Sequence, residues 1–216
     1  MGPAVRNASR GEATRTAILD AAERLFAEHG LDGVSHRQIS SAAGQGNNAA
    51  VGYHFGTTGD LVAAIVERHT TPIDALRGAM ADRVAGSTDI RDWVDCLFRP
   101  MADHLESLGS PTWWARLSAQ LAADPRRHAL YVQHALRSDA LSRTVAGFTA
   151  CLPDLPEPVR EERAAMSRLL SVHVFADRET ALAEGSPTPR ASWSETADGV
   201  VDAMVGLWTA PVTHPS

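Results

Sequence analysis

Residues 34–55, VSHRQISSAAGQGNNAAVGYHF, decide the fold of this chain. The segment predicts two short helices joined by a turn at Gly44. The second helix ends in Tyr53-His54-Phe55 and carries small and polar residues on one side. A helix too short to have a core of its own, with such a face, suits insertion into the major groove of DNA. The segment therefore predicts a DNA-reading helix-turn-helix.

Local signals mark the first of these helices. Ser35 and Gln38 have the spacing of a capping box, in which each side chain bonds to a backbone N–H at the other's position. Val34 and Ile39 occupy the two positions of a hydrophobic staple. We expect this helix to end near residue 43, where Gly44 supplies the left-handed turn.

The second short helix is expected to be capped by Asn47 or Asn48. Its Val51 and Phe55 would face inward, since they are four residues apart on one side. The outward side would then carry small and polar residues, namely Asn48, Ala49, Gly52 and Tyr53.

A one-sided apolar stripe predicts an earlier helix from Thr14 to about His29. Residues 1–11 are polar and contain Gly and Pro, so a flexible arm is expected there. Arg6 and Arg10 would either contact DNA or remain solvated.

Beyond the quoted segment the chain predicts more helices, and it has no alternating strand pattern. One helix is expected to begin after Thr57 or Thr58 and to be kinked or ended by Pro72. Later helices are expected at residues 73–85, 89–107, 112–123, 126–150, 159–184 and 193–209. The fold class is therefore all-α. A three-helix helix-turn-helix domain is expected over residues 1–57, and a larger helical domain for ligand binding and dimerisation over residues 58–216.

Composition argues against several classes of protein. A chain of 216 residues can bury a core without disulfides or metals. The start has no apolar run typical of a signal peptide, and no stretch approaches the roughly 18 apolar residues of a membrane span. We therefore expect a cytoplasmic protein with no membrane partner. Metal-ligand spacings and nucleophile motifs are missing, so neither a metal, a cofactor nor an enzyme is expected.

The charge is unevenly distributed along the chain. The net charge is −6, and every basic residue other than histidine is arginine. Residues 1–56 hold five Arg and five acidic residues, whereas residues 57–216 hold fifteen Arg and twenty-one acidic residues. Because the front is neutral, specific DNA binding would depend on a few well-placed groups.

Motifs in a fixed order connect the chain to a family. Ile18–Gly30 reads I-L-x-A-A-x-x-L-F-A-E-x-G, Ile39–Gly44 reads I-x-x-A-A-G, and Tyr53–Gly56 reads Y-H-F-G. With these motifs, residues 14–66 resemble the DNA-binding region of TetR/AcrR-family transcriptional regulators. The resemblance implies an all-helical homodimer that binds a double-stranded DNA operator. It also implies that a small molecule changes the spacing of the two DNA-binding heads.

The resemblance also implies which residues contact DNA. By position these are His36, Arg37, Asn48, Ala49, Ala50, Gly52, Tyr53 and His54. Gly52 stands where many members have a tyrosine, and Thr58 stands where many have a lysine. Thr58 can still offer a phosphate a hydroxyl and a helix N-terminus, but not a charge.

Each polar member of this set has an alternative role. Arg37 would form either a charged DNA contact or an exposed ion pair. Asn48 would read adenine or only cap the helix. Tyr53 would bind a phosphate or pack, and His54 would contact a phosphate or lie half-buried at the helix end.

The middle of the chain is rich in large side chains, which form either a plain core or the lining of a pocket. Polar groups among them favour a mostly apolar cavity with a few orienting contacts. Adjacent Trp113 and Trp114 cannot both face the same direction on a helix. The expected lining, around residues 93–120 and 145–175, is Trp93, Phe98, Met101, His104, Trp113, Trp114, Arg116, Leu117, Gln120, Phe148 and His173.

The last two expected helices carry wide apolar surfaces. The helix at 159–184 is apolar over a broad arc, which suggests two packing partners: the chain's own body and a second subunit. Packing within a monomer is the alternative. A four-helix dimer interface would use Met166, Leu170, Val174, Val200, Val201, Met204, Val205 and Trp208.

The interpretation favoured by these features is a ligand-responsive transcriptional repressor. A small, mostly apolar effector would release it from a palindromic operator. The alternatives are an enzyme with an N-terminal targeting module, and an activator or ligand-independent architectural protein.

Overall fold

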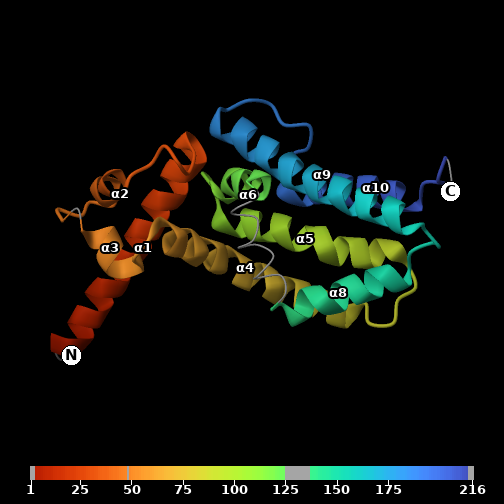
Figure 1. The fold of residues 1–216 in the computed structure, drawn as a ribbon, viewed down its shortest axis with the longest axis horizontal. Coiled ribbons are helices and arrows are strands. Elements are labelled where there is room, and N and C mark those ends of the chain that lie inside the picture. Colours follow the sequence, from red (N-terminus) through yellow and green to blue (C-terminus); the bar gives the residue numbers. More distant parts are fainter. Residues whose placement is uncertain (1–2, 48, 125–136, 214–216) are drawn as a thin grey trace. The chain divides into compact units, whose positions relative to one another are not determined.

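The computed structural model describes residues 3–47, 49–124 and 137–213 (Figure 1). Within these ranges the chain forms helices and no strand, which confirms the all-α prediction. The chain divides into two compact units, residues 1–68 and residues 69–216. None of the described helices combines the length and hydropathy needed to cross a membrane.

The smaller unit contains three helices and the beginning of a fourth. Their bounds are α1 (Pro3–His29), α2 (His36–Ala42), α3 (Ala50–Phe55) and α4 (Thr58–Arg83). Helix α2 packs against both α1 and α3. The core of this unit is built from the fully buried side chains of Ile18, Phe26, Ile39, Val51 and Leu61. A short α3 can be held in place because Val51 enters this shared core.

Helix α1 begins at Pro3, so the structure is helical where a flexible arm was expected over residues 1–11. Pro3 stands in the first turn, where the missing N–H has no intrahelical partner in any case. The residues that follow include Ala4, Ala8 and Ala13, and alanine is the best helix former. Gly11 alone does not outweigh them.

Helix α4 continues across Pro72, so the expectation that Pro72 could end it is wrong. A proline inside a helix removes one backbone hydrogen bond, here to the carbonyl of Arg68. The inward stripe nevertheless continues on both sides, with Ile65 and Ile73 buried. The apolar packing keeps the segment helical.

The larger unit is a helical bundle formed by the rest of α4 and five further described helices. Those five are α5 (Ile90–Leu108), α6 (Trp114–Ala123), α8 (Asp139–Ala150), α9 (Glu157–Ala183) and α10 (Trp193–Thr209). Helix α5 packs against α10 and α8, and α9 packs against α6 and α10 (Figure 1).

Part of the single helix expected over 126–150 lies outside the described residues. Helix α8 has its own start: the Ser138 hydroxyl accepts a hydrogen bond of 3.0 Å from the backbone N–H of Leu141. Ser138 is an N-cap in extended conformation, so one unbroken helix through this point is wrong.

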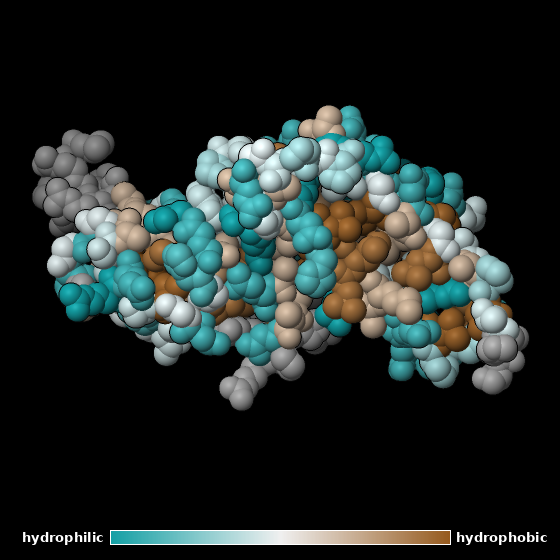
Figure 2. Space-filling model, turned by 90° about the horizontal axis from the view of Figure 1, so that it is seen from above, coloured by the Kyte–Doolittle hydropathy of each residue, from teal (hydrophilic) through white to brown (hydrophobic). Residues whose placement is uncertain are grey.

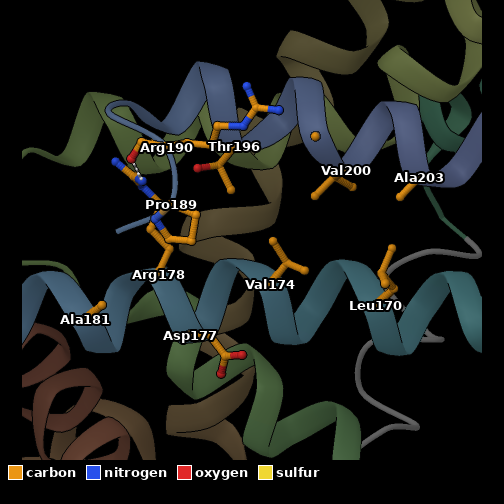
Figure 3. Close-up of a pocket in the computed structure, with 11 residues that line it drawn as sticks. Leu170, Val174, Asp177, Arg178, Ala181, Pro189, Arg190, Thr196, Val200 and Ala203 are labelled. Atoms are coloured by element: carbon orange, nitrogen blue, oxygen red, sulfur yellow. Dashed lines mark hydrogen bonds between the residues drawn. The ribbon is translucent and has the colours of Figure 1, made fainter. Parts of the chain in front are cut away.

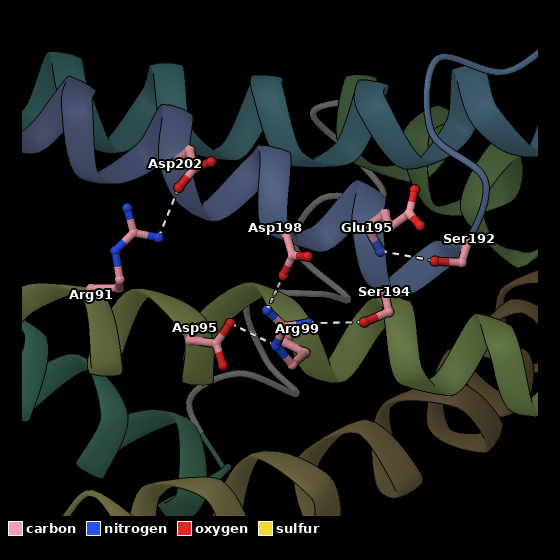
Figure 4. Close-up of polar contacts among 8 residues, drawn as sticks. All are labelled: Arg91, Asp95, Arg99, Ser192, Ser194, Glu195, Asp198 and Asp202. Carbon is pink, nitrogen blue, oxygen red and sulfur yellow. Dashed lines mark hydrogen bonds and ion pairs between the residues drawn. The ribbon is translucent and has the colours of Figure 1, made fainter.

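Ion pairs join α5 to α10 along their exposed edge (Figure 4). The Arg99 guanidinium bonds to Asp95 on α5 and to Asp198 on α10, at 2.7 and 2.6 Å. Closer to the start of α5, Arg91 pairs with Asp202 of α10 at 2.8 Å. Beneath them, apolar side chains of α10 such as Val201 and Met204 are buried.

Helix α9 presents polar side chains to the interior. Arg163 donates hydrogen bonds to the carbonyls of Trp208 and Ala210, at the C-terminal end of α10. Arg178 donates to the carbonyls of Arg190 and Ala191, just before the N-terminal end of α10. These two buried arginines therefore hold α10 at both ends.

A third buried polar residue of α9 caps another helix. Glu179 accepts hydrogen bonds from the backbone N–H groups of Ala115 and Arg116, at 3.1 and 2.9 Å. Trp113, the residue before α6, offers no side-chain cap. The Glu179 carboxylate therefore satisfies N–H groups at the start of α6 that would otherwise lack a partner.

The outward side of α9 carries several large apolar side chains among its charged ones, which is unusual for a surface helix. Its exposed large side chains are Met166, Leu169, Leu170 and Leu182. Viewed from the side on which α9 and α10 lie in Figure 1, apolar residues gather on this part of the larger unit (Figure 2). Patches of this kind on a protein surface usually mark an interaction site.

Candidate nucleic-acid interface

The start of α2 has the predicted capping box. The Ser35 hydroxyl accepts a hydrogen bond from the Gln38 backbone N–H, and the Gln38 side chain accepts one of 2.9 Å from the Ser35 N–H. The staple residues Val34 and Ile39 are both buried. At the other end Gly44 has φ +68°, the left-handed conformation that was expected.

The cap of α3 differs from the prediction. The N-cap residue is Ala49, which has no side-chain hydrogen bond. Asn47 instead accepts a hydrogen bond of 2.9 Å from the Ala49 backbone N–H, through its side-chain oxygen. This is the geometry of an Asx turn, which competes with capping for the same side chain. Asn48 lies outside the described residues.

The outward face of α3 is open. Ala49 and Gly52 are exposed, and Tyr53 is 86% exposed. A Cβ atom added at Gly52 would meet no described atom within 4 Å, so none of its described neighbours requires glycine there. Ala50 and His54 are half-buried, and the His54 ring lies edge-on to Tyr53 with centroids 5.1 Å apart.

The structure brings His36 and Thr58 together from the starts of α2 and α4. His36 Nε2 and Thr58 Oγ1 share a hydrogen bond of 3.0 Å. Both residues are half-buried and lie beside the ends of their helices. The predicted contacts at the beginnings of these two helices therefore form one polar site.

A reciprocal cap at the start of α4 was missed from the sequence. The Thr57 hydroxyl accepts from the Asp60 backbone N–H, and the Asp60 carboxylate accepts from the Thr57 N–H and hydroxyl. These hydrogen bonds lower the pKa of Asp60. The signal was present, because Thr57 and Asp60 have capping-box spacing. Gly56 precedes them at φ +82° and makes the tight turn out of α3.

Two arginines of the smaller unit, Arg37 and Arg15, have no carboxylate partner among the described residues. Arg37 is exposed on α2, and no hydrogen bond or ion pair joins it to another described residue. Arg15 of α1 places its guanidinium carbon 4.8 Å from the centroid of the Phe55 ring, at the end of α3. An exposed helix face with unpaired arginines beside it can meet base edges and phosphates together.

The residues expected to line a ligand pocket all lie in the larger unit. Among them Trp93, His104, Trp114, Leu117 and Phe148 are buried. The half-buried members are Phe98, Met101, Trp113, Arg116 and Gln120, and His173 is exposed.

Several of these side chains contact one another or close neighbours. His104 shares a hydrogen bond of 2.8 Å with His69 of α4, and the His69 ring stacks on Trp114 at 4.3 Å. Trp93 donates to the Ser87 carbonyl. The structure therefore brings α5, α6 and α4 together around an aromatic and histidine cluster.

A groove of about 490 Å³ lies elsewhere, between α9 and α10 (Figure 3). Leu170 and Val174 of α9 face Val200 and Ala203 of α10 across it. Pro189 and Arg190 lie next to each other at one end of the groove, and Asp177 of α9 is also among its lining residues.

The expected dimer residues divide into two groups. Met166 and Leu170 are exposed, and Val174 and Val205 are half-buried. The others are buried within their own chain: Val200, Val201, Met204 and Trp208. Periodicity shows that α10 has an apolar stripe, but not which neighbour covers it. Here α5 and α9 cover much of it.

In the described parts of the chain, His, Cys, Asp and Glu residues form no group of three or more that could hold a metal ion. Both cysteines are free, and burial, followed by nearby Asp95 and Asp92, raises the pKa of Cys96 to about 11. A thiol with this pKa stays protonated at neutral pH.

The segment that contains the open helix α3 is similar to known proteins. Residues 18–65 match the model of the bacterial regulatory proteins of the tetR family. The chain is 29% identical over 121 residues to the transcriptional repressor AcnR of Corynebacterium glutamicum, covering 56% of this chain and 57% of AcnR. It is 32% identical over 117 residues to the repressor Rv1474c of Mycobacterium tuberculosis, covering 51% and 62%. The match thus spans little more than half the length of these relatives.

Solved structures share the fold over a greater length. SmeT, the repressor of the Stenotrophomonas maltophilia multidrug efflux pump SmeDEF, has a TM-score of 0.56 at 21% identity, covering 93% of this chain and 97% of SmeT. NalD, the secondary repressor of the MexAB-OprM pump in Pseudomonas aeruginosa, has a TM-score of 0.55 at 22% identity, covering 90% and 94%. At this identity the likeness concerns the fold.

Proposed function

We propose that this chain, whose residues 18–65 match the tetR family of bacterial regulatory proteins, is a transcriptional repressor released from its operator by a small, mostly apolar effector. The observation that carries the proposal is the open face of α3. Tyr53 is 86% exposed beside exposed Gly52 and Ala49, although the same helix is anchored by fully buried Val51. A helix held from one side and open on the other can enter a major groove.

A homodimer bound to a palindromic operator is part of the proposal. Its support is the apolar outward face of α9, where Leu169 is 49% exposed and Met166 is 44% exposed. Two copies related by a two-fold axis would cover this face in both chains. Two α3 helices would then reach half-sites one helical turn apart, about 34 to 36 Å. Such a protein would act on DNA in the cytoplasm.

The class of effector rests on the side chains of the larger unit. Trp113, Phe98 and Met101 are half-buried in or next to α5 and α6, and so are the polar residues Arg116 and Gln120 of α6. Large apolar groups with a few polar ones are typical of small-molecule sites. SmeT, which shares the fold, has a structure in complex with triclosan.

The proposed function is tested by recovering genomic DNA fragments on the purified protein and sequencing them. We expect a palindromic sequence, retained in a gel shift by the wild-type protein. Arg37→Ala and Tyr53→Ala should each weaken this binding at least tenfold, because a charged or phenolic contact to DNA is lost. Arg143→Ala, at an exposed ion pair of the larger unit, is the matched control and should bind normally.

Two results would count against the proposal. Recovery of no enriched sequence would contradict operator binding as a whole. Normal binding by both the Arg37 and the Tyr53 variants would show that α3 and the start of α2 do not face the DNA.

A further inference from the structure

The four arginines of the smaller unit whose side chains the structure describes fall into two groups by their partners. Arg24 and Arg68 each pair with carboxylates of α1. Arg15 and Arg37 form no hydrogen bond or ion pair with another described residue. The sequence contains no lysine, so these two side chains are cations of this unit that remain available to an anion. Arg37 is already among the predicted DNA contacts, whereas Arg15 is not.

Arg15 lies over an aromatic ring. Its guanidinium carbon lies 4.8 Å from the centroid of the Phe55 ring, which is a cation–π contact. A cation–π contact uses none of the N–H donors of a guanidinium, so they can still bind an anion. A guanidinium fixed in this way loses little freedom when it binds a phosphate.

The ring that holds Arg15 belongs to the helix with the open face. Phe55 is the last residue of α3, and the rings of Tyr53, His54 and Phe55 follow one another with centroids 5.1 and 6.5 Å apart. This row of rings begins at Tyr53, the most exposed side chain of α3, and ends at Phe55, which contacts Arg15 of α1. Its two ends are a phenol and a guanidinium, both of which bind phosphate oxygens.

We propose that Arg15 is a further DNA contact, which binds a backbone phosphate while its guanidinium lies over the Phe55 ring, and thereby positions the C-terminal end of α3. The proposal rests on the proposed function. It adds a residue outside the helix-turn-helix segment, and it assigns Phe55 a role besides packing. The contact would carry no sequence preference, because phosphates are the same at every base pair.

The test uses the full-length protein, the operator recovered above and a random duplex of equal length, with affinity followed by fluorescence anisotropy over a range of salt concentration. Arg15→Gln should weaken binding to both duplexes about tenfold, since a charge-assisted contact is lost. The slope of log affinity against log salt should fall by about 1, the signature of one lost phosphate contact. Arg15→Lys keeps the charge but lacks the planar guanidinium. Its affinity should therefore lie between those of the wild-type protein and of Arg15→Gln.

Arg24→Gln is the matched control. Arg24 lies two and a half turns further along α1, on the opposite side, and is paired with Glu28. The Arg24→Gln substitution should leave the DNA affinity and the slope of log affinity against log salt unchanged. Phe55→Leu removes the aromatic ring next to Arg15. It should weaken DNA binding but change the slope of log affinity against log salt less than Arg15→Gln does, provided that thermal unfolding shows the fold intact.

The proposal is overturned if Arg15→Gln matches Arg24→Gln in affinity and slope while the wild-type protein binds its operator. It is also overturned if the loss occurs on the operator alone, because Arg15 would then read bases. A wild-type protein that binds neither duplex would instead contradict the proposed function.

Discussion

Single buried residues determine how distant segments of this chain meet. Glu179 on α9 is 1% exposed, and its partners Ala115 and Arg116 precede it by more than sixty positions. The Arg116 side chain adds an ion pair of 3.3 Å to the same carboxylate. One carboxylate therefore satisfies backbone donors and a charged group that would all lose their partner if it were removed.

Replacement of Glu179 by alanine should lower the free energy of unfolding by about 2–4 kcal/mol, because buried N–H groups and a guanidinium are left unsatisfied. Urea unfolding followed by circular dichroism measures the change. Glu184→Ala, at an exposed residue just after α9, is the control and should change it by less than about 0.5 kcal/mol. Equal effects of both substitutions would contradict the capping role.

At the scale of elements, α9 has large apolar side chains that a monomer would leave exposed to water. Its buried side includes arginines, serines and a glutamate beside Phe175, and its exposed side includes leucines and a methionine among charged residues. The inner polar groups cost less because Arg163, Arg178 and Glu179 form hydrogen bonds there, and the outer apolar side chains would cost less if a second copy covered them.

A charge on the outward face of α9 should separate the two copies. Leu169→Asp should convert a dimer into a monomer in analytical ultracentrifugation, because burying an unpaired carboxylate in the interface is strongly unfavourable. Leu108→Asp, an equally apolar exposed position at the end of α5, is the control and should remain dimeric. An unchanged sedimentation coefficient for Leu169→Asp would exclude this face as the interface.

The structure also shows what local patterns can and cannot predict. Ser35, Gln38 and Gly44 act within a few residues of one another, and their predicted geometry is confirmed. The Asn47 cap was wrong because the same side-chain oxygen can form an Asx turn at nearly the same place. Helix α10 was recognised by its stripe, but Val201 and Met204 are buried against the chain itself. A hydrophobic period shows that a face is covered and does not name the element that covers it.

At the scale of the whole molecule, the charge of each unit suits its proposed role. Residues 1–68 hold six Arg and seven acidic residues, and residues 69–216 hold fourteen Arg and nineteen acidic residues. Neither unit attracts DNA by net charge, so binding must come from a few placed groups. Because its net charge is negative, the larger unit would not compete with α3 for DNA in the proposed regulator.

An apolar aromatic compound should both stabilise the protein and release its operator. With triclosan as the probe, at about 100 times its dissociation constant, the folded state should gain roughly 2.7 kcal/mol because only that state binds it. The melting temperature and a gel shift measure the two effects. Trp113→Ala should weaken both responses while operator binding without the compound stays normal. Stabilisation without release would mean that binding is not coupled to DNA.

The pair of arginines at the ends of α10 has a consequence for how the molecule opens. Arg163 and Arg178 hold carbonyls at and beside those ends, so neither end of α10 can fray without breaking charge-assisted bonds to α9. The two helices should therefore exchange their amide hydrogens as a single cooperative block. If α9 is also where two copies meet, exchange in α10 would slow as protein concentration rises, although α10 itself is largely buried in its own subunit.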